Sequence, residues 1–273
     1  MNRVATGLEL HAIATGSMQR WAEHPKVNSD QLRSAIAQVK ADLALYESES
    51  NALKAEYLML RNTLALPDFG GIVGLIENLA GDIRPAWMRS RISLMICEPE
   101  LFVRLSRHVL ANQIRDIDKP LPNRPKLVGI GTVMLFDTDP TVTRALGELD
   151  ANQIGKELQK SVLSRELLSA TKSFDNAFLR FRARQAALEV LLAAQAYRRE
   201  KGEFPESLDD LVPQYFDSVP LDPCDRNGGR LLYRRDSTTN AVVWSVGDDG
   251  ADHQGDVDSS ASNRPADVGF LLK

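Results

Sequence analysis

The sequence predicts an α+β protein, with an all-helical domain over residues 1–172 and an α+β domain over residues 173–273. Three observations lead to this prediction. Up to about residue 171, apolar residues recur at the three- and four-residue spacings of amphipathic helices. A long, uninterrupted helical pattern follows and stops at Gly202. Beyond it, prolines, turn residues and two short strand-like runs take over. We therefore expect the long helix to pack on a small antiparallel sheet.

Composition indicates a globular chain and excludes some partners. The chain has 273 residues, of which 43% are hydrophobic and 26% are charged. Its net charge of -4 gives no reason to expect nucleic acid as a partner. The charge is uneven, because residues 201–273 carry 14 acidic and 7 basic residues, whereas residues 1–200 carry 23 acidic and 26 basic residues. Two unlike parts therefore meet near residue 200.

No run of apolar residues predicts a membrane span or a signal peptide. A span needs roughly 18–20 apolar residues, whereas the best run, Leu188–Ala196, is about half that length and contains Glu189. The first 15 residues lack the continuous apolar core of a signal peptide. We therefore expect a soluble chain that meets a membrane only through an anchor absent from this sequence.

Most of the first domain shows the apolar spacing of amphipathic helices. One amphipathic helix is predicted after the caps Asn28–Asp30, a second from Leu53 to Pro67, and a third from Glu98 to Pro120. Residues 118–125 contain three prolines and are expected to form a loop. Residues 126–137 fit either a buried strand or a packed helix, and helical pattern resumes near Val142.

The second domain begins with the most regular helix, predicted from Phe174 to Lys201. A short capped helix is expected at residues 207–211, and Val219–Pro223 should be extended because each proline restricts the residue before it. Strands are predicted at residues 231–234 and 241–246, joined by a turn at residues 236–240 into an antiparallel hairpin.

An acidic loop directly follows the second predicted strand. Residues 244–258 contain five aspartates, and no Lys or Arg occurs between Asp236 and Asn263. Crowded carboxylates repel one another, and calcium relieves the repulsion by accepting six to eight oxygen ligands at about 2.3–2.6 Å. Glycines at positions 247, 250 and 255 allow the backbone to turn tightly. The alternative is a solvated loop that binds nothing.

The order of motifs around this loop resembles the C-terminal half of the major pseudopilin of type II secretion systems. That family shows a helix, a G-x-Y-P-x-x-x-x-L segment, a P-x-D-P turn, and Y-S-L-G-x-D-G followed by acidic residues. The corresponding segments lie in this order: Phe174–Lys201, Gly202–Leu211, Pro220–Pro223, Tyr233 and Trp244–Gly250. Residues 266–269 echo a later piece of the family pattern. The resemblance covers residues 174–258, under a third of the chain.

The resemblance implies a structural calcium ion and its ligands. Ser245 and Asp249 match the serine of the family motif and the aspartate of its D-G pair, and Asp256 and Asp258 fall where its later acidic ligands lie. Asp252 completes the expected metal ligands, and Asp248 is a further acid of the same loop. The chain departs from the family in lacking its processing site and apolar N-terminal helix, and in carrying about 170 helical residues of its own.

No motif predicts catalytic residues or an organic cofactor. The histidines at positions 11, 24, 108 and 253 form no HExxH pair, and G-x-S-x-G, the P-loop and G-x-G-x-x-G are missing. His253 lies among the acids, where oxygen ligands favour calcium over zinc. Cys97 and Cys224 are compatible with one disulfide or with two buried thiols.

These observations lead to one functional expectation and one alternative. By resemblance, the chain is a non-enzymatic structural or assembly component of an exported or envelope-associated, extracytoplasmic system, with protein partners or self-association. The alternative is an exported hydrolase or ligand-binding protein whose site lies in the N-terminal helical domain.

Overall fold

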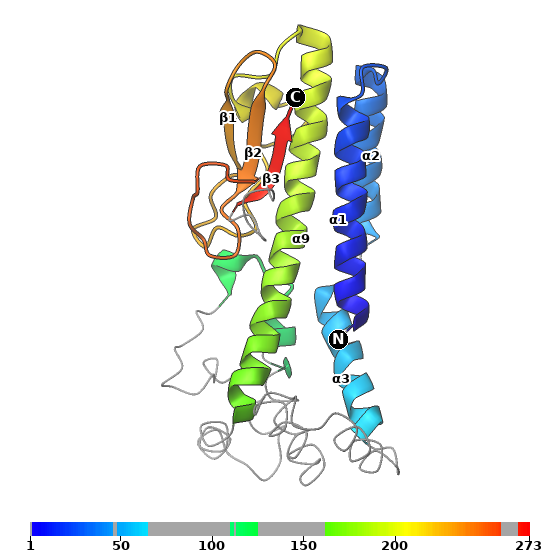
Figure 1. The fold of residues 1–273 in the computed structure, drawn as a ribbon, viewed down its shortest axis with the longest axis vertical. Helices are drawn as coiled ribbons and strands as arrows, with labels where there is room; N and C mark the ends of the chain where they lie inside the picture. The colour runs from blue at the N-terminus through cyan, green and yellow to red at the C-terminus, as the bar shows by residue number, and fades with distance from the viewer. Residues whose placement is uncertain (1, 46–47, 65–109, 112, 125–161, 258–266) are drawn as a thin grey trace, which may run out of the picture. The chain divides into compact units, whose positions relative to one another are not determined.

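The computed structural model describes residues 2–45, 48–64, 110–111, 113–124, 162–257 and 267–273 (Figure 1). It confirms the α+β class, with helices, one long helix and a three-stranded antiparallel sheet. In chain order the elements are α1 (Asn2–Glu23), α2 (Ser29–Ala44), α3 (Glu49–Leu64), the 3-10 helix η2 (Leu121–Asn123), α9 (Val162–Lys201), the 3-10 helix η3 (Leu208–Leu211), β1 (Leu232–Arg235), β2 (Ala241–Ser245) and β3 (Val268–Leu272).

The chain divides into two compact units. Unit 1 comprises Met1–Glu47, Pro120–Pro122 and Asn176–Lys273, and unit 2 comprises Ser48–Lys119 and Asn123–Asp175. The division within α9 lies three residues from the domain boundary expected at residue 172. The association of α1 and α2 with the C-terminal sheet is a feature that the sequence did not predict.

Helix α9 is longer than its sequence pattern indicated, because it begins at Val162 rather than at Phe174. Its 40 residues correspond to a length of about 60 Å. The helix ends as predicted: Gly202 takes φ 86° and its N–H donates to Arg198 O at 2.9 Å. Positive φ is readily adopted by glycine, which makes Gly202 a favourable helix stop.

The core of unit 1 lies between α9 and the elements around it. Alanines and leucines of α9 between Ala187 and Ala196 are almost completely buried. They share one hydrophobic cluster with these side chains of α2, the segment after α9, and the sheet: Leu32, Ile36, Val39, Phe204, Leu208, Leu211, Ala241, Val243, Phe270 and Leu272. One helix therefore packs on both α2 and the sheet.

The sheet is a meander in the order β1-β2-β3, with both pairs antiparallel. The predicted hairpin is confirmed: Tyr233 pairs with Val243, and the turn closes when Asp236 N and Ser237 N donate to Asn240 O at 3.0 Å. Strand β3, which pairs Phe270 with Val243, was not predicted as a strand. Its five residues, VGFLL, lack the apolar–polar alternation that indicates a half-buried strand.

Unit 2 is described only in part. The start of α3 is capped by Asp118, which accepts hydrogen bonds from Ser48 Oγ at 2.9 Å and Ser50 N at 3.1 Å. Arg124 pairs with Asp175 and donates to Ile117 O at 2.6 Å. Most of the helix predicted between residues 98 and 119 and the whole ambiguous segment 126–137 lie outside the described residues, as does the helical pattern between residues 142 and 161.

Candidate functional site

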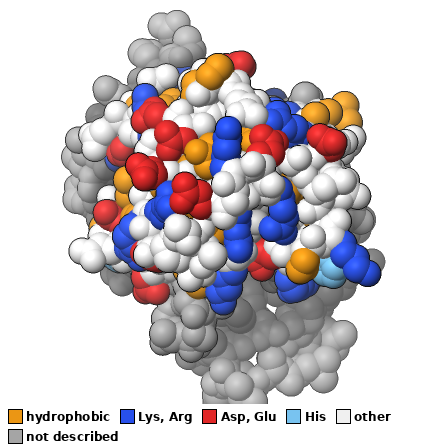
Figure 2. Space-filling model, turned by 90° about the horizontal axis from the view of Figure 1, so that it is seen from above, with side chains coloured by type: hydrophobic (Ala, Val, Ile, Leu, Met, Phe, Trp, Pro, Cys, Tyr) orange, Lys and Arg blue, Asp and Glu red, His pale blue; other side chains and the backbone are white. Residues whose placement is uncertain are grey.

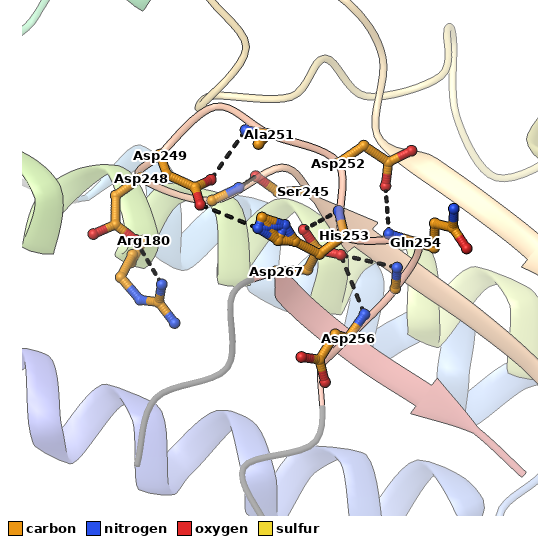
Figure 3. Close-up of polar contacts among 12 residues, drawn as sticks. Arg180, Ser245, Asp248, Asp249, Ala251, Asp252, His253, Gln254, Asp256 and Asp267 are labelled. Atoms are coloured by element: carbon orange, nitrogen blue, oxygen red, sulfur yellow. Dashed lines mark hydrogen bonds and ion pairs between the residues drawn. The ribbon is translucent and has the colours of Figure 1, made fainter. Parts of the chain in front are cut away.

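The acidic loop folds back over the outer face of the sheet. The inner face of the sheet, with Val243 and Phe270, packs in the α9 core. On the outer face, Gly255 comes so close that an added Cβ would lie 3.2 Å from both Trp244 and Val242. The Trp244 indole Nε1 donates to Asp252 Oδ1 at 3.0 Å. The loop therefore lies against β2 at Val242 and Trp244, and Figure 3 shows the polar contacts within it.

The glycines perform the backbone role that the sequence predicted. Gly247, Gly250 and Gly255 adopt φ angles of 70°, 71° and 83°. These left-handed conformations are costly for other residues. Gln254 shares this region with φ 60°, so the end of the loop turns sharply toward Asp267.

Asp267 holds the far end of the loop. Its side chain is fully buried and accepts three backbone hydrogen bonds, from His253 N at 3.3 Å, Gly255 N at 2.8 Å and Asp256 N at 3.2 Å (Figure 3). Burial raises the pKa of this carboxyl, while the three N–H groups and His253 act in the opposite direction. Asp267 immediately precedes β3, so it joins the loop directly to the sheet.

Asp222 holds the beginning of the loop. This carboxylate, 3% exposed, accepts hydrogen bonds from Ser245 Oγ at 2.6 Å, Val246 N at 2.9 Å and Cys224 N at 2.8 Å. It thereby connects the turn at residues 220–224 to the end of β2. Burial raises the pKa of the adjacent Cys224 thiol to about 12. Cys224 is a free buried thiol, and Cys97 lies outside the described residues.

A third aspartate joins the loop to the long helix. Asp248 accepts from Arg180 Nη1 at 2.7 Å (Figure 3) and from Asn176 Nδ2 at 3.1 Å, and both donors belong to α9. The side chains of Arg180 and Asp248 are each 19% exposed. The ion pair is thus partly shielded from water, which strengthens it relative to a surface pair.

The structure brings the expected metal ligands onto one loop but not around one point. Asp249 accepts from Ala251 N at 3.0 Å and pairs with His253 Nε2 at 3.3 Å, whereas Asp252 accepts from Trp244 and from Gln254 N at 2.8 Å. Ser245 is fully buried against Asp222. Asp256 is exposed, and Asp258 lies outside the described residues. In the described part of the chain, no three His, Cys, Asp or Glu side chains are grouped closely enough to hold a metal ion.

The chemistry of this donor set suits calcium, but its described geometry does not complete a ligand shell. Carboxylate and carbonyl oxygens are the ligands that calcium prefers. As they lie, Asp249 and Asp252 are oriented toward N–H groups of the protein. A calcium shell would require these two carboxylates to turn and further oxygens to approach.

Sequence reasoning did not identify Asp222 and Asp267 as the residues that organise the loop. Each belongs to a motif that the sequence displays, since Asp222 lies in Pro220–Pro223 and Asp267 immediately precedes β3. Their roles depend on tertiary neighbours. An aspartate can hold a loop in place only when several N–H groups point at its buried carboxylate. The spacing of residues along the chain does not reveal which N–H groups these will be.

The alternative site was expected in the N-terminal helical domain, residues 1–172, of which residues 65–109 and 125–161 lie outside the described residues. Among the described helices, none is sufficiently long and apolar to span a bilayer. On the face of the molecule shown in Figure 2, acidic and basic side chains are interspersed. That face therefore lacks the single-sign patch that electrostatic recognition of nucleic acid uses.

No protein-family model, curated protein or solved structure matches this chain.

Proposed function

We propose that the chain is a non-enzymatic structural or assembly component of an exported or envelope-associated, extracytoplasmic system, and that its C-terminal part is a pseudopilin-like module. The observation that carries the proposal is the attachment of the acidic loop to the sheet by the buried carboxylates Asp222 and Asp267. These carboxylates bind backbone groups of the protein itself. Because these side chains hold the protein's own backbone in place, their arrangement supports a structural role for the loop.

The order of elements adds support. A long helix, a short helical turn, a proline-containing turn, a hairpin and an acidic loop follow one another in α9, η3, Pro220–Pro223, β1–β2 and residues 246–257. The motifs that resemble the pseudopilin family occur in the same order. A module of this kind acts through its surface, so its partners would be other proteins or further copies of itself.

We further propose that calcium completes the loop. The residues that would hold it are Asp249, Asp252, Asp256 and Asp258, together with main-chain carbonyl groups nearby. When bound, the ion would supply positive charge among carboxylates that otherwise repel one another. A ligand that binds only the folded state stabilises that state.

Thermal unfolding of the full chain in calcium and in chelator tests this proposal. At a free calcium concentration of 100 times the dissociation constant, linkage contributes about 2.7 kcal/mol, which corresponds to a rise of about 5–10 °C in the midpoint. Asp256→Ala combined with Asp258→Ala should abolish this rise, because both substitutions remove oxygen ligands. Equal midpoints in calcium and chelator for the unmodified chain would refute the calcium proposal.

A matched control removes the same charge elsewhere in unit 1. Glu206 and Asp217 are exposed residues outside the loop, so the pair Glu206→Ala and Asp217→Ala should leave the calcium-dependent rise intact. A second readout is Trp244 fluorescence, because its indole donates to Asp252. In a chain with Trp21→Phe and Trp87→Phe, calcium should change the emission of Trp244.

A further inference from the structure

Residues 220–231 fold back on themselves and carry the single Asn-Gly pair of the sequence, Asn227-Gly228. A backbone hydrogen bond from Asp222 N to Gly229 O at 2.8 Å joins the two sides of this turn. The Asn-Gly pair lies at the tip, between these two joined sides. A chemical change in the backbone of the pair therefore acts on the residues that close the turn.

The carboxylate of Asp225 organises the tip of the turn. It accepts hydrogen bonds from Asn227 N and Gly229 N, each at 2.8 Å. The backbone of Gly229 passes so close that an added Cβ would lie 2.3 Å from Asp225 Oδ2. Gly228, between the two donors, takes φ 73°, a conformation that glycine adopts readily. The backbone spacing between residues 227 and 229 is thus matched to the two oxygens of one carboxylate.

The side chain of Asn227 is free to approach the backbone nitrogen that follows it. Asn227 is exposed, and its side-chain amide makes no hydrogen bond within the described part of the chain. Gly228 has no side chain that would hinder access to its own nitrogen. This nitrogen donates to Asp225 O at 3.1 Å, so a reaction at Gly228 N requires that hydrogen bond to open. Exposed turns open locally at a lower cost in free energy than core elements.

We propose that Asn227 is a site of spontaneous covalent modification, at which Gly228 N attacks the side-chain amide carbon Cγ. The nitrogen gives its proton to hydroxide and forms a bond to Cγ, and the Nδ2 group takes a proton from water and leaves as ammonia. Water then opens the resulting cyclic imide. Cleavage of the new N–Cγ bond gives aspartate, whereas cleavage of the original peptide bond gives isoaspartate, in which the chain continues through Cγ.

The isoaspartate product changes the geometry of the turn. It inserts a methylene group into the backbone between Asn227 and Gly228, and the longer backbone does not keep both hydrogen bonds to Asp225. Displacement of Gly229 weakens the hydrogen bond between its carbonyl and Asp222 N. Because Asp222 holds the beginning of the acidic loop, isoaspartate loosens this attachment. The inference is independent of the proposed function and of calcium.

Peptide mass spectrometry of the full chain, aged in chelator at mildly alkaline pH, tests the proposal. The peptide that contains Asn227 should gain the mass difference between water and ammonia and separate into an aspartate form and an isoaspartate form. Asn240 is the internal control, because it is also exposed but precedes Ala241 rather than glycine. An Asn227 that stays intact while a synthetic peptide of residues 222–232 is converted would overturn the proposal.

The variant Asn227→Gln tests the assignment to this residue. Glutamine keeps the amide but has one more methylene group, so the favourable ring of the imide no longer forms. The aged variant should lose the mass gain completely. If the peptide of this variant gains the same mass at the same rate, Asn227 is not the reacting residue and the proposal is wrong.

Thermal unfolding in chelator measures the effect on the attachment of the loop. The isoaspartate form, isolated by chromatography, should unfold about 3–6 °C below the unmodified chain, because hydrogen bonds at the tip are lost. Asn227→Asp adds the charge without lengthening the backbone, and this exposed substitution should change the midpoint by less than about 2 °C. Equal midpoints for the isoaspartate form and Asn227→Asp would contradict the coupling between the turn and the loop.

Discussion

At the scale of single residues, buried aspartates determine how the acidic loop is held. Asp267 accepts three backbone N–H groups at the far end of the loop, and Asp222 accepts two N–H groups and one hydroxyl at its beginning. A buried N–H group that loses its acceptor costs about 1–3 kcal/mol. The loop is therefore more sensitive to these two carboxylates than to its exposed acids.

Replacing Asp267 by alanine should lower the free energy of unfolding by about 2–4 kcal/mol, because three N–H groups lose their common acceptor in a buried place. The measurement is urea unfolding followed by circular dichroism, in the presence of chelator. Asp256→Ala provides the control, since Asp256 is exposed and should change stability by less than about 0.5 kcal/mol. Equal losses in the two variants would show that Asp267 does not organise the loop.

At the scale of elements, α9 and β3 each require a glycine, but for different reasons. In α9 the reason is the backbone conformation, and in β3 it is the space available beside the strand. Gly202 ends α9 because it accepts φ 86°, and a Cβ added there would meet nothing within 4 Å. A Cβ on Gly269 would lie 2.0 Å from Val243 O in the neighbouring strand. Gly269 is therefore required by the close approach of β2 and β3.

Gly269→Ala should consequently destabilise unit 1 by about 3 kcal/mol or more, because the β2–β3 pair cannot relax without moving backbone atoms. Gly202→Ala should cost only about 1–2 kcal/mol, the strain of a left-handed conformation in an open position. Thermal or urea unfolding of both variants compares the two costs. A smaller loss for Gly269→Ala than for Gly202→Ala would contradict the strand pairing described above.

The attachments of α1 and α2 also differ in energy. A buried Leu, Ile or Val side chain contributes about 1.5–3 kcal/mol, and α2 buries three of them, at positions 32, 36 and 39. A side-chain hydrogen bond contributes a net of about 0.5–1.5 kcal/mol. Each polar contact of α1 is thus weaker than each buried apolar side chain of α2, and Met18 and Ala22 of α1 add apolar packing against the same core.

At the scale of the whole molecule, the polar contacts of α1 make the stability of unit 1 depend on pH. Burial lowers the pKa of His11 below its usual value, hydrogen bonding to Gln185 opposes this shift, and the charge of Arg184 adds to it. Phe181 covers the ring at a centroid distance of 4.2 Å. The folded state therefore favours the neutral imidazole.

Because the pKa of His11 is lower in the folded than in the unfolded state, the unfolded state binds more protons as the pH falls below about 6.5. Stability should therefore fall between pH 7.5 and pH 5. His11→Gln should reduce this dependence, since glutamine keeps a hydrogen-bonding group without titrating. Urea unfolding of both chains at several pH values measures the difference, and identical pH slopes would contradict it.

Local chemistry was sufficient to predict much of the second domain. The end of α9 at Gly202, the hairpin, and the three glycines with positive φ follow from residue type and spacing, because each depends on backbone preferences within a few residues. The calcium ligands expected at residues 245–258 stay a prediction. They depend on how the side chains converge, which is a property of the folded loop.

The sequence by itself determined the α+β class, the long helix, the hairpin and an acidic loop rich in turn-forming glycines. Only the tertiary structure decided that α1 and α2 pack with the C-terminal sheet, that β3 completes this sheet, and that Asp222 and Asp267 hold the loop. The physical reason is distance along the chain. Gln19 and Leu271 are 252 residues apart, and a contact over such a separation leaves no periodic pattern, because it arises only when the core brings both partners together.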